Sequence, residues 1–124
     1  MGKIVIQKNT EGQYHFVLKA RNGEIVAASA AYASVAQCES VVNTTRCSAP
    51  VSPVEDQTAS RHNVLRQPKF ELYRGAQGEY RFHLRAEDGT VLLAGEGYTT
   101  KANCQNGIAS VKENAPDAIL IKEV

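Results

Sequence analysis

Apolar and polar side chains alternate with a period of two in the second half of the chain, first over residues 69–73 and again over residues 79–85. This alternation predicts two strands with one buried face each. Asp88-Gly89 follows the second run and favours a tight turn, and residues 91–94 form a third apolar run that predicts a third strand. The alternating apolar residues are Phe70, Leu72, Tyr80, Phe82 and Leu84.

The period then changes from that of a strand to that of a helix. Cys104, Ile108, Val111 and Ala115 are spaced at i, i+4, i+7 and i+11, which is one stripe of a helix. We expect this helix to begin after Thr100 and to end before Pro116. The apolar residues 118–121 predict a terminal strand.

The whole pattern occurs twice. When the sequence is shifted by 66 positions against itself, residues 3–50 align with residues 69–116 without a gap, and 13 of these 48 positions are identical. In the first copy, Ser34 and Gln37 form a capping box that predicts the helix start, and Pro50 ends the helix. Residues 52–56 predict a weaker, edge-like last strand, because Pro53 cannot donate to a ladder. We therefore expect two copies of one strand-strand-strand-helix-strand unit, at 1–58 and 69–124, joined by a connecting loop at 59–68.

The composition indicates the broad class of protein but does not indicate a chemical activity. The 124 residues are 43% hydrophobic and 22% charged, with 14 basic and 13 acidic side chains, as in one ordinary soluble domain with a core of its own. No apolar run approaches the roughly 20 residues that cross a bilayer, and the first residues contain no secretory signal. We expect a cytoplasmic protein that does not enter a membrane.

The second copy resembles the YegP-like family of small bacterial proteins of unknown function. The resemblance rests on Lys69-Phe70-Glu71-Leu72-Tyr73, Gly78-Glu79-Tyr80-Arg81-Phe82, Gly97-Tyr98, residues 106–112 and Asn114-Ala115-Pro116. The first copy departs from this pattern at residues 40–45 of its helix. The resemblance implies an α+β fold: one antiparallel sheet with both helices on one face, in which each unit contributes its last strand to the other. It also implies a monomer in which the two copies form an internal pseudo-dimer.

Reactive side chains form no convergent catalytic set. Cys38 and Cys104 lie on the apolar stripes of their helices, where free cysteine acts as a small hydrophobe, although their position one turn from a helix N-terminus leaves a thiol-based activity open. Cys47 has no counterpart in the second copy and is expected at the surface. The three histidines lack metal-ligand spacing, so we expect neither a metal nor a cofactor.

The outward face of the sheet is the most informative surface for binding. Alternation directs His15 and Lys19 of the first copy, and Arg81, His83 and Arg85 of the second, away from the apolar face. Antiparallel sheets often leave one face in water, and a solvated face is the alternative to a binding surface. These five residues are the candidate ligand-binding set.

Two tyrosines, Tyr32 and Tyr98, precede the two helices at matched positions. We expect them to pack against the helix start or to bond backbone, with a paired binding cleft as the alternative. The sequence as a whole favours a non-catalytic accessory module that binds an unidentified protein or small ligand. Weak nucleic-acid binding through the outward face is a second hypothesis, although few aromatic side chains accompany its cations.

Overall fold

The computed structural model describes residues 2–124, and its elements follow the predicted order twice. The first copy contains β1 (Lys3–Lys8), β2 (Tyr14–Lys19), β3 (Ile25–Ala28), α1 (Val35–Ser48), the short 3-10 helix η1 (Ala49–Val51) and β4 (Val54–Asp56). The second copy contains β5 (Lys69–Arg74), β6 (Tyr80–Arg85), β7 (Val91–Gly95), α2 (Lys101–Asn114) and β8 (Ile119–Glu123).

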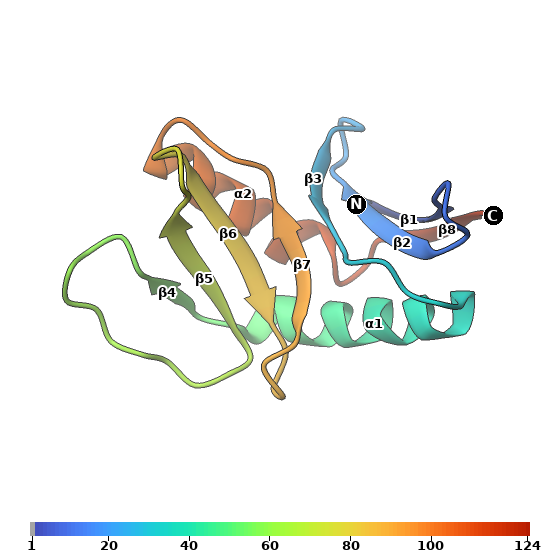
Figure 1. Ribbon diagram of the computed structural model, residues 1–124, viewed down its shortest axis with the longest axis horizontal. Coiled ribbons are helices and arrows are strands. Elements are labelled where there is room, and N and C mark those ends of the chain that lie inside the picture. The colour runs from blue at the N-terminus through green and yellow to red at the C-terminus, as the bar shows by residue number, and fades with distance from the viewer. Residues whose placement is uncertain (1) are drawn as a thin grey trace.

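All eight strands of residues 2–124 form one open sheet in the order β4-β5-β6-β7-β3-β2-β1-β8. The two copies meet in the middle, where β3 and β7 pair antiparallel (Figure 1). Each copy gives its last strand to the other, since β4 pairs with β5 and β8 pairs with β1. The predicted α+β fold with exchanged strands is confirmed. The two exchanged strands run parallel to their new neighbours, so the sheet is mixed at its two edges and antiparallel between them.

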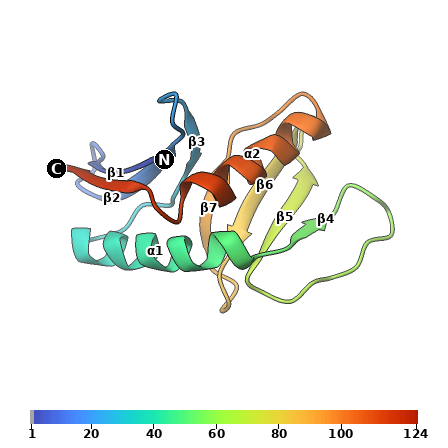
Figure 2. The same cartoon turned by 180° about the vertical axis from the view of Figure 1, so that it is seen from behind.

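Both helices lie on one face of this sheet (Figure 2). The core between them and the sheet contains the alternating residues that the sequence pattern indicated, including Phe16, Leu18, Phe82 and Leu84. Cys38 and Cys104 are fully buried in the same core. The opposite face carries no helix, and we call it the uncovered face.

Local signals account for where the helices begin and where the hairpins turn. The Ser34 side chain accepts a hydrogen bond from Gln37 N, and Thr100 accepts one from Asn103 N. The Gln37 side chain turns back to Ala33 N, one residue before the N-cap. In each of the turn pairs Asn22-Gly23 and Asp88-Gly89, the glycine has a positive φ, 86° and 89°, and the residue before it does not. These are therefore ordinary turns closed by a left-handed glycine, so the asparagine and the aspartate stay unstrained.

Candidate functional site

The five residues predicted to bind a ligand lie on the uncovered face but in two separate places. His15 and Lys19 belong to β2, whereas Arg81, His83 and Arg85 belong to β6, and β7 and β3 lie between these two strands. The Arg81 Nε donates to Glu79 Oε2 at 3.0 Å. The structure does not gather the five residues into one basic patch, and their ligand-binding role stays a prediction.

A row of directly paired residues crosses the uncovered face through all eight strands of residues 2–124. Its members, from one edge to the other, are Ile121, Val5, Val17, Ala28, Ala94, His83, Glu71 and Glu55. The shift of 66 positions relates the two ends of the row, so that Val5 is the counterpart of Glu71 and Ile121 the counterpart of Glu55. The five residues from Ile121 to Ala94 are apolar, and the last three, His83, Glu71 and Glu55, are ionisable.

The carboxylate end of the row is buried. Glu55, Lys69 and Glu71 are only 2%, 4% and 7% exposed. Lys69 Nζ lies 2.8 Å from Glu55 Oε1 and 3.3 Å from Glu71 Oε2, so it joins the two carboxylates. The Gln57 amide also donates to both carboxylates, at 2.5 Å to Glu55 and 3.1 Å to Glu71. We call these residues, with His83 and Arg85, the buried charge cluster.

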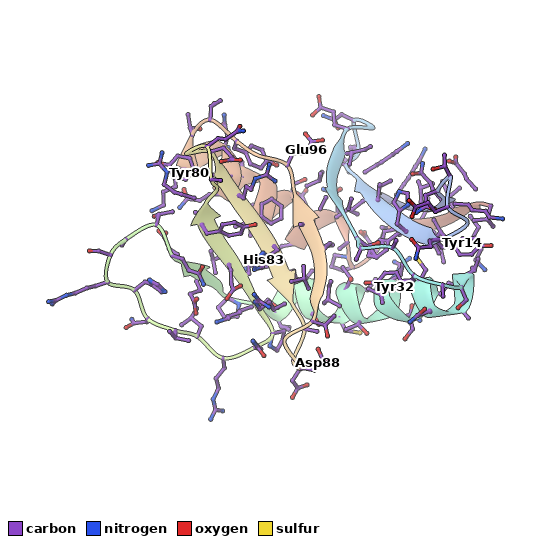
Figure 3. All side chains as sticks on the ribbon, in the orientation of Figure 1. Tyr14, Tyr32, Tyr80, His83, Asp88 and Glu96 are labelled. Carbon is purple, nitrogen blue, oxygen red and sulfur yellow. The ribbon has the colours of Figure 1, made fainter. Side chains whose placement is uncertain are left out.

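His83 and Arg85 complete the cluster on the β6 side. Figure 3 shows His83 in the middle of β6. Its Nε2 contacts Glu71 Oε1, and Arg85 Nε donates to the same oxygen at 2.5 Å. The Tyr73 ring lies beside the imidazole, with 5.0 Å between the ring centroids. Glu71 therefore already contacts two of the residues that the sequence pattern directed to this face.

The cluster keeps its carboxylates ionised. Burial alone raises the pKa of Glu55, but hydrogen bonds from Gln57, Lys69 and the Leu65 N–H outweigh burial and lower its pKa to about 2. Burial likewise raises the pKa of Glu71, and hydrogen bonds from His83 and Arg85 bring it to about 2. The hydrogen bond to Glu55 raises the pKa of Lys69. A general acid or base needs a pKa near the working pH, so these two carboxylates are suited to holding structure together.

One hydrogen bond ties the cluster to the connecting loop. Glu55 Oε1 accepts the Leu65 N–H at 2.6 Å, which anchors residues 57–68 beside β4. A pocket of about 360 Å³ lies between this loop and β4, with Arg61, His62 and Asn63 on its loop side. Loops that a rigid framework positions often carry binding residues, but this pocket combines opposite charges and favours no ligand class.

The cysteines are placed as the apolar stripes predicted. Burial raises the pKa of Cys38 and raises that of Cys104 to about 11, so both thiols are protonated at neutral pH. Cys47 is exposed. A thiol-based activity needs an accessible thiolate, and the two matched cysteines do not supply one.

A second pocket, of about 320 Å³, lies between the two copies, and we call it the α2 pocket. One wall is α2, which contributes Asn103, Asn106, Gly107 and Ser110, together with Tyr98 just before the helix. The Tyr98 ring stacks on the core ring of Phe82, with centroids 6.3 Å apart. The ring is therefore held firmly while its hydroxyl group faces Gly107.

The β2–β3 hairpin of the first copy forms the other wall. Asn22 and Glu24 come from the turn, Ile25 and Val26 from β3, and Ala20 from the end of β2. The Asn22 side chain accepts the Glu24 N–H at 3.0 Å, which stiffens the turn. The pocket thus has an apolar floor and several amide, hydroxyl and carboxylate groups, as small-molecule sites commonly do.

Gly107 lets Tyr98 pack closely against α2, and the twin position in α1 differs at this point. A Cβ atom at Gly107 would collide with the Tyr98 hydroxyl and lie 2.9 Å from Tyr98 Cζ and 3.0 Å from Phe82 Cε2. The equivalent residue in α1 is Val41, which packs against the core. Its tyrosine, Tyr32, has a hydroxyl that is buried without a hydrogen-bond partner in residues 2–124. Where α1 carries the Val41 side chain, α2 carries none, and the Tyr98 and Phe82 rings lie against the α2 backbone instead.

No group of three His, Cys, Asp or Glu residues within residues 2–124 is arranged to hold a metal ion. Neither α1 nor α2 is long and apolar enough to cross a bilayer.

Comparison with known proteins finds the same unit elsewhere. The model of the domain of unknown function DUF1508 matches residues 9–56 and 76–121, one match in each copy. UPF0339 protein YegP of Yersinia pestis is 34% identical over 120 residues, covering 97% of this chain and 94% of the relative. A UPF0339 protein of Treponema denticola is 46% identical over 54 residues, which is 44% of this chain but 93% of that protein. Some relatives thus consist of little more than one unit.

The fold is shared as well. The solution structure of E. coli yegP, a protein of unknown function, superimposes with a TM-score of 0.81 at 25% identity, covering 98% of this chain and 92% of that one. The arrangement of two units in one sheet is therefore the arrangement of this solved relative.

Proposed function

This chain belongs to the family defined by the domain of unknown function DUF1508, and we propose that it is a non-catalytic module that binds a small molecule in the α2 pocket. Gly107 carries this proposal. At one position of two otherwise similar helices, the missing side chain lets Tyr98 lie against α2, and Tyr98 and Gly107 both line the pocket between the copies.

The chemistry of the pocket supports binding of a polar ligand. Three asparagine amides, Asn22, Asn103 and Asn106, each supply both a donor and an acceptor, and Ser110 and Tyr98 add hydroxyl groups. Ile25 and Val26 add apolar surface that a ligand would bury. A few convergent polar groups above an apolar floor are the usual composition of a specific small-molecule site.

The rest of the molecule supports a non-catalytic role. The carboxylates of the buried charge cluster are occupied by cations and have pKa values of about 2. The two matched thiols are buried and protonated. These groups stabilise the fold, and the pocket itself contains no histidine, cysteine or lysine among its lining residues in the described chain.

A fragment screen by ¹H–¹⁵N NMR tests the proposal. A panel of small polar molecules is added to the labelled protein, and chemical-shift changes are mapped. We expect ligands to perturb the amides of residues 103–110 of α2 and 22–26 of the hairpin together. Asn106→Trp should abolish these changes, because Asn106 is exposed on α2 and a large side chain there fills the pocket without disturbing the core.

The matched control is Ser40→Trp, since Ser40 is the α1 counterpart of Asn106 and is also exposed. This variant should bind the same fragments as the unmodified protein. Binding that maps to the connecting loop or the uncovered face, or that survives Asn106→Trp, would contradict the proposal. So would a panel in which no molecule perturbs the pocket.

A further inference from the structure

The charges around the α2 pocket identify the kind of ligand. Resting on the proposed function, we infer that the ligand of the α2 pocket is a small organic cation, an amine or guanidinium compound that also carries hydrogen-bonding groups. Three features indicate this ligand class: a carboxylate among the lining residues, the tyrosine side chain that lines the pocket, and the absence of cations among the lining residues within residues 2–124.

One carboxylate lines the pocket, and a second lies two residues before the pocket tyrosine. Glu24 is a lining residue on the hairpin wall. Glu96 lies directly after β7, and Figure 3 shows it on the side facing the β2–β3 hairpin. Burial raises the pKa of Tyr98, and electrostatic interactions with Cys104 and Glu96 raise it further.

No positive side chain balances these carboxylates inside the pocket. Within residues 2–124, no lysine, arginine or histidine is among its lining residues, and neither Glu24 nor Glu96 takes part in an ion pair. An anionic ligand would therefore enter a negative site with no counter-charge, whereas a cation would be attracted. This contrasts with the buried charge cluster, where each carboxylate already has a cation.

A neighbouring pocket does not change the negative charge at the α2 pocket. Arg21 lines that neighbouring space, of about 310 Å³, but Glu113 lines it too, and the pair contributes no net charge. The α2 pocket shares only Ala20 and Asn22 with it.

The neutral groups of the pocket suit the same ligand. The Tyr98 side chain lines the pocket, and aromatic rings attract ammonium and guanidinium groups. The oxygen atoms of Asn103, Asn106 and Ser110 can accept N–H donors, and their own donors can bind a ligand hydroxyl or carbonyl group. The geometry thus combines a counter-charge, an aromatic ring and hydrogen-bonding groups.

Three four-carbon probes of the same length separate charge from shape: putrescine as the cation, 1,4-butanediol as the neutral molecule and succinate as the anion. Each is titrated into ¹⁵N-labelled protein at low salt, and the shifts of residues 103–110 and 22–26 are followed. We expect putrescine to bind at the pocket, the diol to bind more weakly and succinate not to bind. Glu24→Gln should weaken putrescine binding about fivefold, as expected for the loss of one partly exposed charge partner.

The control is Glu11→Gln, which makes the same charge change in the remote β1–β2 turn and should leave putrescine binding unchanged. Raising the salt concentration should weaken putrescine binding in the unmodified protein. Equal binding of the diol and putrescine, or a preference for succinate, would overturn the inference that the ligand is a cation. The α2 pocket would remain a binding site. If Glu24→Gln weakens putrescine binding no more than Glu11→Gln does, the inference of a cationic ligand is likewise overturned. If none of the three probes perturbs the pocket, the inference is overturned here, and the fragment screen decides the proposed function separately.

Discussion

The two copies of the unit share their buried face and differ on the surfaces that the core does not constrain. Toward the helices, the first copy places Phe16 and Leu18 where the second has Phe82 and Leu84. On the uncovered face, Val5 and Val17 of the first copy correspond to Glu71 and His83 of the second. All four of the core residues are buried against the helices, whereas these two matched positions on the other face are apolar in the first copy and ionisable in the second.

This contrast shows which interactions the fold needs. An apolar row and an ionic row support the same strand pairing, so the hydrophobic face toward the helices determines the architecture. The ionic row adds a different property, because its charges require specific partners and hold the connecting loop through Glu55. The divergence at Gly107 and Val41 follows the same rule, since it changes a pocket and leaves the helix in place.

The largest effect should come from removing the cation at the centre of the buried charge cluster. Lys69→Met leaves the Glu55 carboxylate buried without its only close lysine and should lower the free energy of unfolding by about 3–5 kcal/mol. Its twin, Lys3→Met, changes an exposed residue and should alter stability by less than about 0.5 kcal/mol. Urea denaturation of both variants measures the difference, and similar losses would show that the ionic row is no more important than its apolar counterpart.

Acid should weaken the protein at the buried charge cluster. The pKa values of Glu55 and Glu71 are lowered to about 2 in the folded protein, so their ionised forms stabilise it. This stabilisation is fully present above the pKa of the unfolded chain, near 4.5, and is lost as the pH falls from there toward about 2. The expected loss is on the order of a few kcal/mol and is measured by denaturant unfolding between pH 7 and pH 2.5.

A matched pair of variants assigns this acid sensitivity. Glu71→Gln should flatten the dependence of stability on pH, whereas Glu79→Gln, which removes a carboxylate paired with Arg81 at the surface, should leave its shape nearly unchanged. If both variants keep the slope of the unmodified protein, the acid sensitivity arises outside the buried charge cluster.

A smaller effect is expected at the glycine of α2. Alanine is favoured over glycine in a helix by about 1 kcal/mol, but at Gly107 its Cβ would press on Tyr98 and Phe82. We expect Gly107→Ala to lower the free energy of unfolding by about 1 kcal/mol net, because overpacking costs about 1–3 kcal/mol. Asn106→Ala, at the exposed neighbouring position, should keep or slightly raise stability. A stabilised Gly107→Ala variant would mean that the close approach of α2 to Tyr98 is not tight.

The smallest effect distinguishes the two tyrosines. Tyr32→Phe removes a hydroxyl that is buried without a partner and should raise the free energy of unfolding by about 1 kcal/mol. Tyr98→Phe removes a hydroxyl that lines the α2 pocket, and its stability should stay within about 0.5 kcal/mol of the unmodified protein. Thermal unfolding of the two variants side by side provides the measurement. Equal shifts of the unfolding temperature would contradict the expected difference between the Tyr32 and Tyr98 hydroxyl groups.

Much of this fold could be predicted from local patterns. Period-two alternation located the strands, the spacing from Cys104 to Ala115 located α2, and Ser34 and Thr100 marked the helix starts. The exchange of the last strands was predicted through the family resemblance, and the sheet confirms it. The parallel direction of the exchanged strands was not predicted, because it depends on which edge of the sheet receives them.

The candidate site was harder to predict. Alternation directed His83 and Arg85 outward, but it could not show that Glu71 binds both, because that contact joins neighbouring strands. Two signals were present in the aligned copies: Glu71 stands opposite Val5, and Gly107 stands opposite Val41. Each marks a place where one copy has changed its chemistry while the repeat is otherwise preserved.

The sequence by itself determined the repeated unit, its elements and the residues of its core, because periodicity, caps and turns act over a few neighbouring residues. Only the tertiary structure decided which charges are neutralised and where a pocket opens. Glu55 comes from the first copy and Lys69 from the second, and the α2 pocket has one wall from each copy. These features depend on the exchange of strands and the packing of a helix against a hairpin, which bring together residues that are far apart in the chain.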